Sequence, residues 1–214
     1  MKDIIILPTY NERDNIAPLI KEIFSIVPNV SIMVVDDNSP DGTALVVEEL
    51  IVRYPRLSIL KRKTKNGLRG AYIEAFKKIL KDSDIRHIVM MDADFSHHPR
   101  YLPNLFRMAK EYDLVIGSRY VCGGGVAEWE TWRRWLSIGG NFYVRSILRH
   151  SLRDWTAGFA CINAGALRAI DLTAINLSGY AFLPDSATEN YHARDSRDPH
   201  RLIREVRPRS ARLP

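Results

Sequence analysis

Residues 32–43 read Ile32-Met33-Val34-Val35-Asp36-Asp37-Asn38-Ser39-Pro40-Asp41-Gly42-Thr43. The apolar run at the start predicts a buried strand over Ile32–Asp36, and the pattern that follows the segment predicts a helix over Thr43–Tyr54. Between them lie Asp, Asn, Ser, Pro and Gly, which are typical of turns. The same order of short apolar run, polar loop and amphipathic stretch recurs through the first 120 residues.

The remaining elements of this alternation can be assigned in the same way. Four further strands are predicted at Ile4–Leu7, Leu57–Leu60, His87–Asp92 and Leu114–Gly117. Three further helices are predicted at Asn15–Val27, Gly70–Lys81 and Pro99–Tyr112. This alternation predicts an α/β fold, with a mostly parallel central sheet and helices on both of its faces. Ligands of such sheets bind beyond the carboxyl ends of the strands.

Length and composition indicate one globular domain. The chain has 214 residues, of which 46% are hydrophobic and 26% are charged, which is ordinary for an α/β protein with one core. No apolar run approaches the roughly 18 residues that span a bilayer, and the N-terminus does not resemble a signal peptide. The two cysteines, Cys122 and Cys161, lack metal-ligand spacing. We therefore expect a reducing, cytoplasmic setting.

Polar loops follow three of the predicted strands, at Pro8–Glu12, Asp36–Ser39 and Asp92–Asp94. Any one of them is as well explained by a turn or a helix N-cap, but three at one edge of the sheet favour a binding site. Alternation along the strand predicts that Asp92 and Asp94 point to the same side. Two carboxylates and the phosphate oxygens of a substrate suit a hard divalent cation.

Several motifs together resemble one enzyme family. They are Pro8-Thr9-Tyr10-Asn11-Glu12-Arg13, Val34–Thr43, Met91-Asp92-Ala93-Asp94-Phe95-Ser96-His97-His98-Pro99, Gly117-Ser118-Arg119-Tyr120-Val121 and Thr156-Ala157-Gly158-Phe159. Over about residues 3–182 the chain resembles the dolichol-phosphate mannosyltransferases, which are inverting family 2 glycosyltransferases with a single GT-A domain. The resemblance implies transfer of mannose from GDP-mannose to a dolichol or other polyprenyl phosphate.

The resemblance also implies roles for individual residues. The nucleotide-sugar site would comprise Pro8, Tyr10, Glu12, Val35, Asp37, Asp92, Ala93 and Asp94. The ion, Mg²⁺ or Mn²⁺, would be held by Asp92, Asp94 and Ser96. The acceptor phosphate would be bound by Arg119, Arg133, Arg134 and Ser137. Asp92, Asp94 and Arg119 would be the catalytic residues, and guanidinium groups independently suit a phosphate because they bind it in a bidentate manner.

The acceptor chemistry explains why we assign no catalytic base. The second pKa of a phosphate monoester is about 6, so the lipid phosphate is already largely dianionic near neutral pH. Positioning and neutralisation of charge are then sufficient for attack. His97 and His98 are more simply explained as turn or capping residues before Pro99 than as catalytic groups.

Residues 129–153 change in character. Aromatic and aliphatic side chains recur there at helical spacing, and six arginines lie between Arg119 and Arg153. A basic amphipathic helix of this kind either lies in a membrane interface or packs on the sheet, and both interpretations stay open. We expect peripheral association with the cytosolic face of a membrane, and an anchoring partner subunit is a further candidate.

The last segment, residues 183–214, departs from the family. It contains seven arginines, four prolines and no lysine, and it has scarcely any periodic apolar pattern, which is typical of disorder. The abrupt switch after Phe182 resembles a change of reading frame. We therefore expect a domain over 1–182 whose C-terminal part is incomplete, followed by a divergent tail.

Three functional hypotheses follow. The first is the GDP-mannose-dependent enzyme, the second is the same enzyme class with UDP-glucose, and the third is a nucleotide-sugar-binding remnant without turnover. The formal net charge of +6 also suits nucleic acid, but the acidic edge of the sheet would repel a polyphosphate, and no nucleic-acid-binding module is recognisable. A dinucleotide-binding dehydrogenase is disfavoured, because Pro8-Thr9-Tyr10-Asn11 follows the first strand where a glycine-rich turn would be required.

Overall fold

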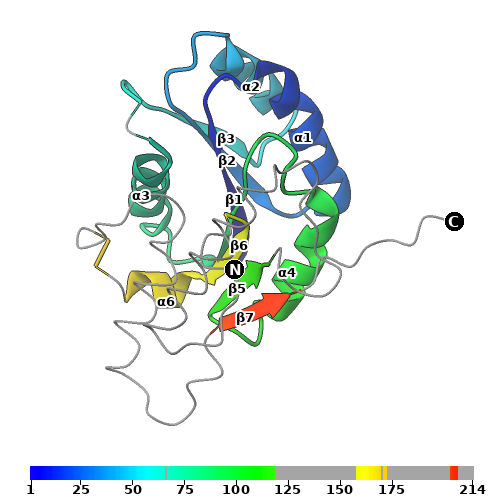
Figure 1. The fold of residues 1–214 in the computed structure, drawn as a ribbon, viewed down its shortest axis with the longest axis vertical. Coiled ribbons are helices and arrows are strands. Elements are labelled where there is room, and N and C mark those ends of the chain that lie inside the picture. The colour runs from blue at the N-terminus through cyan, green and yellow to red at the C-terminus, as the bar shows by residue number, and fades with distance from the viewer. Residues whose placement is uncertain (66, 119–157, 170, 173–202, 207–214) are drawn as a thin grey trace, which may run out of the picture.

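A computed structural model describes residues 1–65, 67–118, 158–169 and 171–172, and the backbone of 203–206 (Figure 1). Strands and helices alternate through the first part of the chain, as predicted. In chain order the elements are β1 Lys2–Thr9, α1 Arg13–Ile26, β2 Ser31–Asp36, α2 Thr43–Ile51, β3 Leu57–Lys61, α3 Gly67–Ile79, β4 Ile85–Met90, the 3₁₀ turn η1 Pro99–Tyr101, α4 Leu102–Met108, β5 Leu114–Gly117, β6 Ala160–Asn163, α6 Ala164–Arg168 and β7 Ile203–Val206.

The strands form one sheet in the order β3-β2-β1-β4-β6-β5-β7. β1 pairs in parallel with β2 and with β4, and β2 pairs in parallel with β3. β6 is antiparallel to both of its neighbours, β4 and β5, and β7 runs parallel to β5. The mostly parallel α/β fold is therefore confirmed, and β1, β2, β3 and β4 all present their carboxyl ends at one edge.

Apolar side chains cover both faces of the sheet. On one face Tyr72 and Phe76 of α3 and Leu167 of α6 pack against strand residues such as Ile6 and Met90. On the other face the buried residues of α1, α2 and α4 pack against alternate strand residues. Figure 1 shows the same division, with α3 and α6 on one side of the sheet and α1, α2 and α4 on the other. Strands buried on both faces are apolar almost throughout, which explains their continuous hydrophobic runs.

Two boundaries differ from the prediction. The fourth strand ends at Met90, before Asp92, so Asp92 and Asp94 lie in a loop and alternation along a strand does not orient them. The predicted helix over 99–112 is a 3₁₀ turn followed by a helix that begins at Leu102 and ends at Met108. Pro103 lies in the first turn of α4, where a missing amide hydrogen is tolerated because that amide has no partner within the helix.

Three described elements were not predicted. β6 and α6 follow the motif that ends at Phe159, and β7 falls within the tail for which we expected disorder. At least Ile203–Val206 of that tail is therefore extended and paired with β5. The rest of residues 183–214 lies outside the described residues, as does the amphipathic stretch at 129–153, so the expectations for both segments stay predictions. Among the described residues, no helix combines the length and hydrophobicity needed to cross a bilayer.

Candidate functional site

The polar loops after β1, β2 and β4 begin at the same edge of the sheet, because these three strands are adjacent and parallel. Thr9 at the end of β1 is level with Asp36 at the end of β2. The Asp37 amide donates to the Thr9 carbonyl oxygen at 3.0 Å, and the Met91 amide donates to the Ile6 carbonyl oxygen at 3.2 Å. The predicted convergence of the three loops is confirmed.

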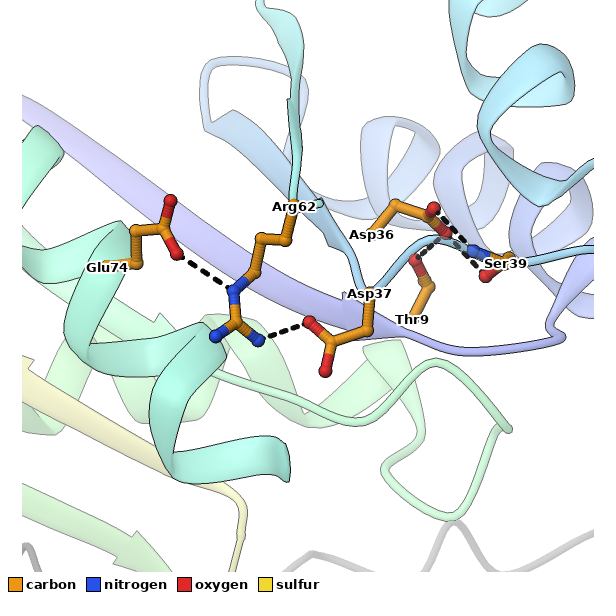
Figure 2. A network of polar contacts seen from close by, with 6 residues as sticks. All are labelled: Thr9, Asp36, Asp37, Ser39, Arg62 and Glu74. Atoms are coloured by element: carbon orange, nitrogen blue, oxygen red, sulfur yellow. Dashed lines mark hydrogen bonds and ion pairs between the residues drawn. The ribbon is translucent and has the colours of Figure 1, made fainter. Parts of the chain in front are cut away.

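Asp36 joins the first two loops (Figure 2). Its carboxylate accepts hydrogen bonds from the Thr9 hydroxyl at 3.0 Å, from the Ser39 hydroxyl at 2.6 Å and from the Ser39 amide at 2.9 Å. The Ser39 hydroxyl oxygen in turn accepts from the Asn11 amide at 3.1 Å. Asn11 and Asn38 both have positive φ values, of 62° and 59°, a backbone conformation that asparagine adopts more readily than most residues. Asp36 therefore shapes these loops from within.

Asp37 forms a buried ion pair with Arg62, which follows β3 (Figure 2). The side chains of both residues are almost fully buried. The Arg62 Nε also donates to Glu74 of α3 at 2.8 Å, and its amide donates to the Asp36 carbonyl oxygen at 2.8 Å. Asp37, which we predicted to contact the nucleotide, thus also has a partner within the protein. Arg62 could not be recognised from the sequence, because an arginine between Lys61 and Lys63 is typical of an exposed cationic surface.

A second set of contacts joins the starts of α1 and α2. The Thr43 hydroxyl oxygen accepts from the Glu12 amide at 3.0 Å, and the Asp41 carboxylate accepts from the Arg13 amide at 3.1 Å. Asp41 also accepts from the Thr43 amide at 2.9 Å and from the Thr43 hydroxyl at 2.6 Å. Burial raises the pKa of the Asp41 carboxyl, but the hydrogen bonds from Thr43 and Arg13 outweigh burial and lower that pKa overall. The Pro8–Arg13 and Val34–Thr43 motifs therefore form one interlocked structure.

The loop after β4 has two internal hydrogen bonds. The Asp94 carboxylate accepts from the Ser96 amide at 2.9 Å, and the Asp92 amide donates to Nδ1 of His97 at 2.9 Å. Loss of hydration raises the pKa of the Asp94 carboxyl, but the hydrogen bonds from Ser96 outweigh that effect and lower this pKa overall. Asp94 is exposed and the Asp92 side chain is one-quarter exposed. This loop presents carboxylate oxygens to solvent, as a cation site requires.

The other predicted nucleotide residues differ in exposure. Tyr10 is exposed, and Nζ of Lys65 lies 3.4 Å from the centre of its ring. Val35 is fully buried and belongs to the hydrophobic core on one face of the sheet. A contact of Val35 with the nucleotide stays a prediction. The Glu12 carboxylate accepts from the Asn15 side chain at 2.8 Å. Pro8 is partly buried at the end of β1, and Ala93 is buried within the loop after β4.

The predicted acceptor residues Arg119, Arg133, Arg134 and Ser137 lie outside the described residues. His98 has the capping role that we expected, because its Nδ1 accepts from the Arg100 amide at 3.4 Å at the start of η1. It also lies 3.4 Å from the Glu22 carboxylate. His97 closes the preceding loop. The two adjacent histidines therefore have separate local roles.

Comparison with known proteins identifies the family. Residues 4–171 match the sequence model of glycosyl transferase family 2. The chain is 42% identical over 186 residues to undecaprenyl-phosphate mannosyltransferase of Micrococcus luteus, covering 86% of this chain and 76% of that protein. It is 41% identical over 191 residues to polyprenol monophosphomannose synthase of Mycolicibacterium smegmatis, covering 86% of this chain and 70% of that protein.

A solved structure shares the fold. The mannosyltransferase PcManGT from Pyrobaculum calidifontis, in complex with GDP-Man and Mn²⁺, superposes with a TM-score of 0.59 at 18% identity, covering 95% of this chain and 54% of that one. The parallel sheet with its acidic loops is the GT-A arrangement that the motifs implied. From the family match and the identity to both relatives, we conclude that the chain belongs to glycosyl transferase family 2.

Proposed function

We propose that this protein transfers mannose from GDP-mannose to a polyprenyl phosphate, and that the product is a polyprenyl phosphate mannose. The observation that carries the proposal is the 42% identity, over 86% of the chain, to a protein named as an undecaprenyl-phosphate mannosyltransferase. A second relative is named as a polyprenol monophosphomannose synthase. The two interlocked loops after β1 and β2, together with the acidic loop after β4, supply the kind of edge at which a nucleotide binds to a parallel sheet.

The loop after β4 fits a divalent cation that is shared with the donor. Among the described residues no group of three or more His, Cys, Asp or Glu side chains could hold a metal ion, so the protein would supply the two carboxylates of Asp92 and Asp94 together with an oxygen of Ser96. Mg²⁺ commonly binds through one or two carboxylates together with substrate phosphates. When bound, such an ion would offset the charge that develops on the departing diphosphate. PcManGT was solved with Mn²⁺ and GDP-Man, so Mg²⁺ and Mn²⁺ are the candidates.

The residues of this chain would then position the two substrates. Pro8, Tyr10, Glu12 and Asp37 would border the nucleotide, with Asp37 oriented by Arg62. The lipid phosphate needs no general base, because its second pKa is about 6. Arg119, Arg133, Arg134 and Ser137 would orient the phosphate oxygen for an in-line, inverting attack on the sugar carbon. The acceptor is a lipid, so we also propose peripheral binding to the cytosolic face of a membrane, unaided or through an anchoring partner subunit.

Product formation tests the proposal. Purified protein is incubated with GDP-mannose labelled in the sugar, a short polyprenyl phosphate and Mg²⁺ or Mn²⁺, and the label is followed into the organic phase. We expect a metal-dependent mannolipid, and we expect it to disappear with the double substitution Asp92→Asn and Asp94→Asn. UDP-glucose is the matched control donor. Formation of glucolipid from UDP-glucose, without mannolipid from GDP-mannose, would show that UDP-glucose is the donor.

The departure of residues 183–214 from the family favours a second candidate, a protein that binds the donor without turning it over. Metal-dependent binding of GDP-mannose, measured by calorimetry, without any lipid product would support it. Mannolipid formed by this chain would reject it. For the enzyme, a double variant that retains the turnover of its parent would contradict the metal assignment. For the donor-binding protein, a double variant that retains metal-dependent binding of GDP-mannose would contradict it.

A further inference from the structure

His97 closes the loop that carries the two aspartates. Its Nδ1 accepts a hydrogen bond from the backbone amide of Asp92 at 2.9 Å, and the same nitrogen lies 3.6 Å from the Asp92 carboxylate. Between the two residues, Phe95 has a φ of 64°, which is unfavourable for a bulky side chain. Such a conformation persists only where surrounding contacts hold it. The hydrogen bond to His97 on one side and the Ser96–Asp94 hydrogen bond on the other supply those contacts.

The His97 ring is itself held from outside the loop. It stacks on Phe159, with ring centres 5.1 Å apart and planes inclined by 15°. Phe159 is buried, and its carbonyl oxygen accepts from the Gly117 amide at 2.8 Å. A Cβ at position 117 would come within 2.6 Å of the Phe159 ring, so this packing requires glycine there. The ends of β5 and β6 thus fix the plane of the imidazole that receives the Asp92 amide.

We propose that His97 is a positioning residue that sets the divalent-metal affinity of the site by fixing the backbone of Asp92. This inference rests on the proposed function, in which Asp92 and Asp94 bind the ion. His97 would not coordinate the metal or contact the donor. Its Nδ1 accepts the hydrogen bond from the Asp92 amide. Its ring stacks on Phe159, which is anchored between β5 and β6, and this stacking restricts the motion of the loop. Groups that orient metal ligands commonly change metal affinity about 10–100-fold when they are removed.

Three substitutions separate the acceptor from the ring. His97→Asn places an amide oxygen close to the position of Nδ1, so it keeps an acceptor for the Asp92 amide and loses the ring. His97→Phe keeps a ring that can stack on Phe159 and removes the acceptor. His97→Gln places its polar atoms one bond further out, near the position of Nε2. His98→Gln is the matched control, because the neighbouring histidine instead caps η1 through the Arg100 amide.

The measurement is Mn²⁺ binding in the presence of saturating GDP. The electron paramagnetic resonance signal of free Mn²⁺ reports how much of the ion is bound. We expect His97→Phe and His97→Gln to weaken Mn²⁺ binding about 10-fold or more, His97→Asn to retain most of the affinity, and His98→Gln to leave it unchanged. Circular dichroism and thermal melting without metal establish that each variant is folded. Gly117→Ala displaces the Phe159 ring and leaves the sequence of the loop after β4 unchanged. We expect this variant to bind Mn²⁺ more weakly as well, because His97 loses its stacking partner.

The outcomes separate this inference from the proposed function. Unchanged Mn²⁺ affinity in His97→Phe or in Gly117→Ala would overturn the inference, and so would a loss in His97→Asn as large as that in His97→Phe. Absence of Mn²⁺ binding by the unaltered protein with GDP would overturn both the inference and the metal assignment. Mn²⁺ binding that follows the expected order, without any mannolipid from the unaltered protein, would leave the inference standing and reject the proposed activity.

Discussion

Arg62 is a buried cation whose two acidic partners differ in exposure. The Asp37 side chain is 8% exposed and the Glu74 side chain is 51% exposed. Burial lowers the pKa of the Arg62 guanidinium, but the hydrogen bonds and charges of Glu74 and Asp37 outweigh burial and raise that pKa overall, so Arg62 stays charged. Removal of Arg62 would leave Asp37 as an uncompensated charge with little access to water.

We therefore expect Arg62→Met to lower the free energy of unfolding by about 3–5 kcal/mol, the usual cost of breaking one side of a buried ion pair. Urea denaturation at neutral pH measures this loss. Glu74→Gln is the matched control, and it should cost less than about 1 kcal/mol, because an exposed partner is well solvated without its cation. An Arg62→Met protein as stable as the Glu74→Gln protein would show that Asp37 is not held as described.

At the scale of elements, the starts of α1 and α2 depend on one carboxylate. Asp41 accepts hydrogen bonds from the backbone amides of Arg13 and Thr43, so it satisfies donors at the beginnings of two helices that lie on the same face of the sheet. Helix starts have unpaired amide groups and favour negative charge. Gly42, with a φ of 88°, supplies the left-handed backbone that brings the chain into α2.

This arrangement predicts a pH dependence of stability. The folded protein holds the pKa of Asp41 below its ordinary value of 3.8, so the stabilisation from the charged form is complete above that value and is lost as the pH falls through the lower, folded-state pKa. We expect the stability difference between the unaltered protein and Asp41→Asn to be constant between about pH 5 and pH 7 and to shrink below about pH 4. Guanidinium denaturation at several pH values measures it. A difference that grows on acidification would contradict the assigned contacts.

At the scale of the whole molecule, β7 covers the edge of β5. Residues 114–117 would otherwise present unpaired backbone groups at the end of the sheet, and exposed edges of this kind favour association with other chains. Leu114, Val115 and Ile116 are buried and apolar, which adds to that tendency.

A chain that ends before Ile203 should therefore aggregate faster than the full chain. Static light scattering during heating gives the onset, and we expect it several degrees lower for the shortened chain. A matched control ends after Val206, which removes the last residues and keeps the pairing with β5. Equal onsets for all three chains would show that β7 does not protect the sheet edge.

Local patterns were sufficient for the first part of the fold. Five strands and four helices were predicted because strands buried on both faces have continuous apolar runs and surface helices are amphipathic. The carboxyl-edge loops followed from the parallel order of the strands. β6 was missed because its four residues carry no periodicity of their own, and its position depends on pairing with both β4 and β5.

The chain's local chemistry therefore specified the α/β class, the acidic edge and the motifs of the family. Only the tertiary structure determined which side chains form hydrogen bonds and ion pairs with one another. The Asp37–Arg62 pair joins residues 25 positions apart, and His97 reaches the Asp92 amide only because Phe95 turns the loop back and Phe159 supports the ring. A charged residue looks the same in the sequence whether its side chain is exposed to solvent or buried, and only the packing of the folded chain determines its environment.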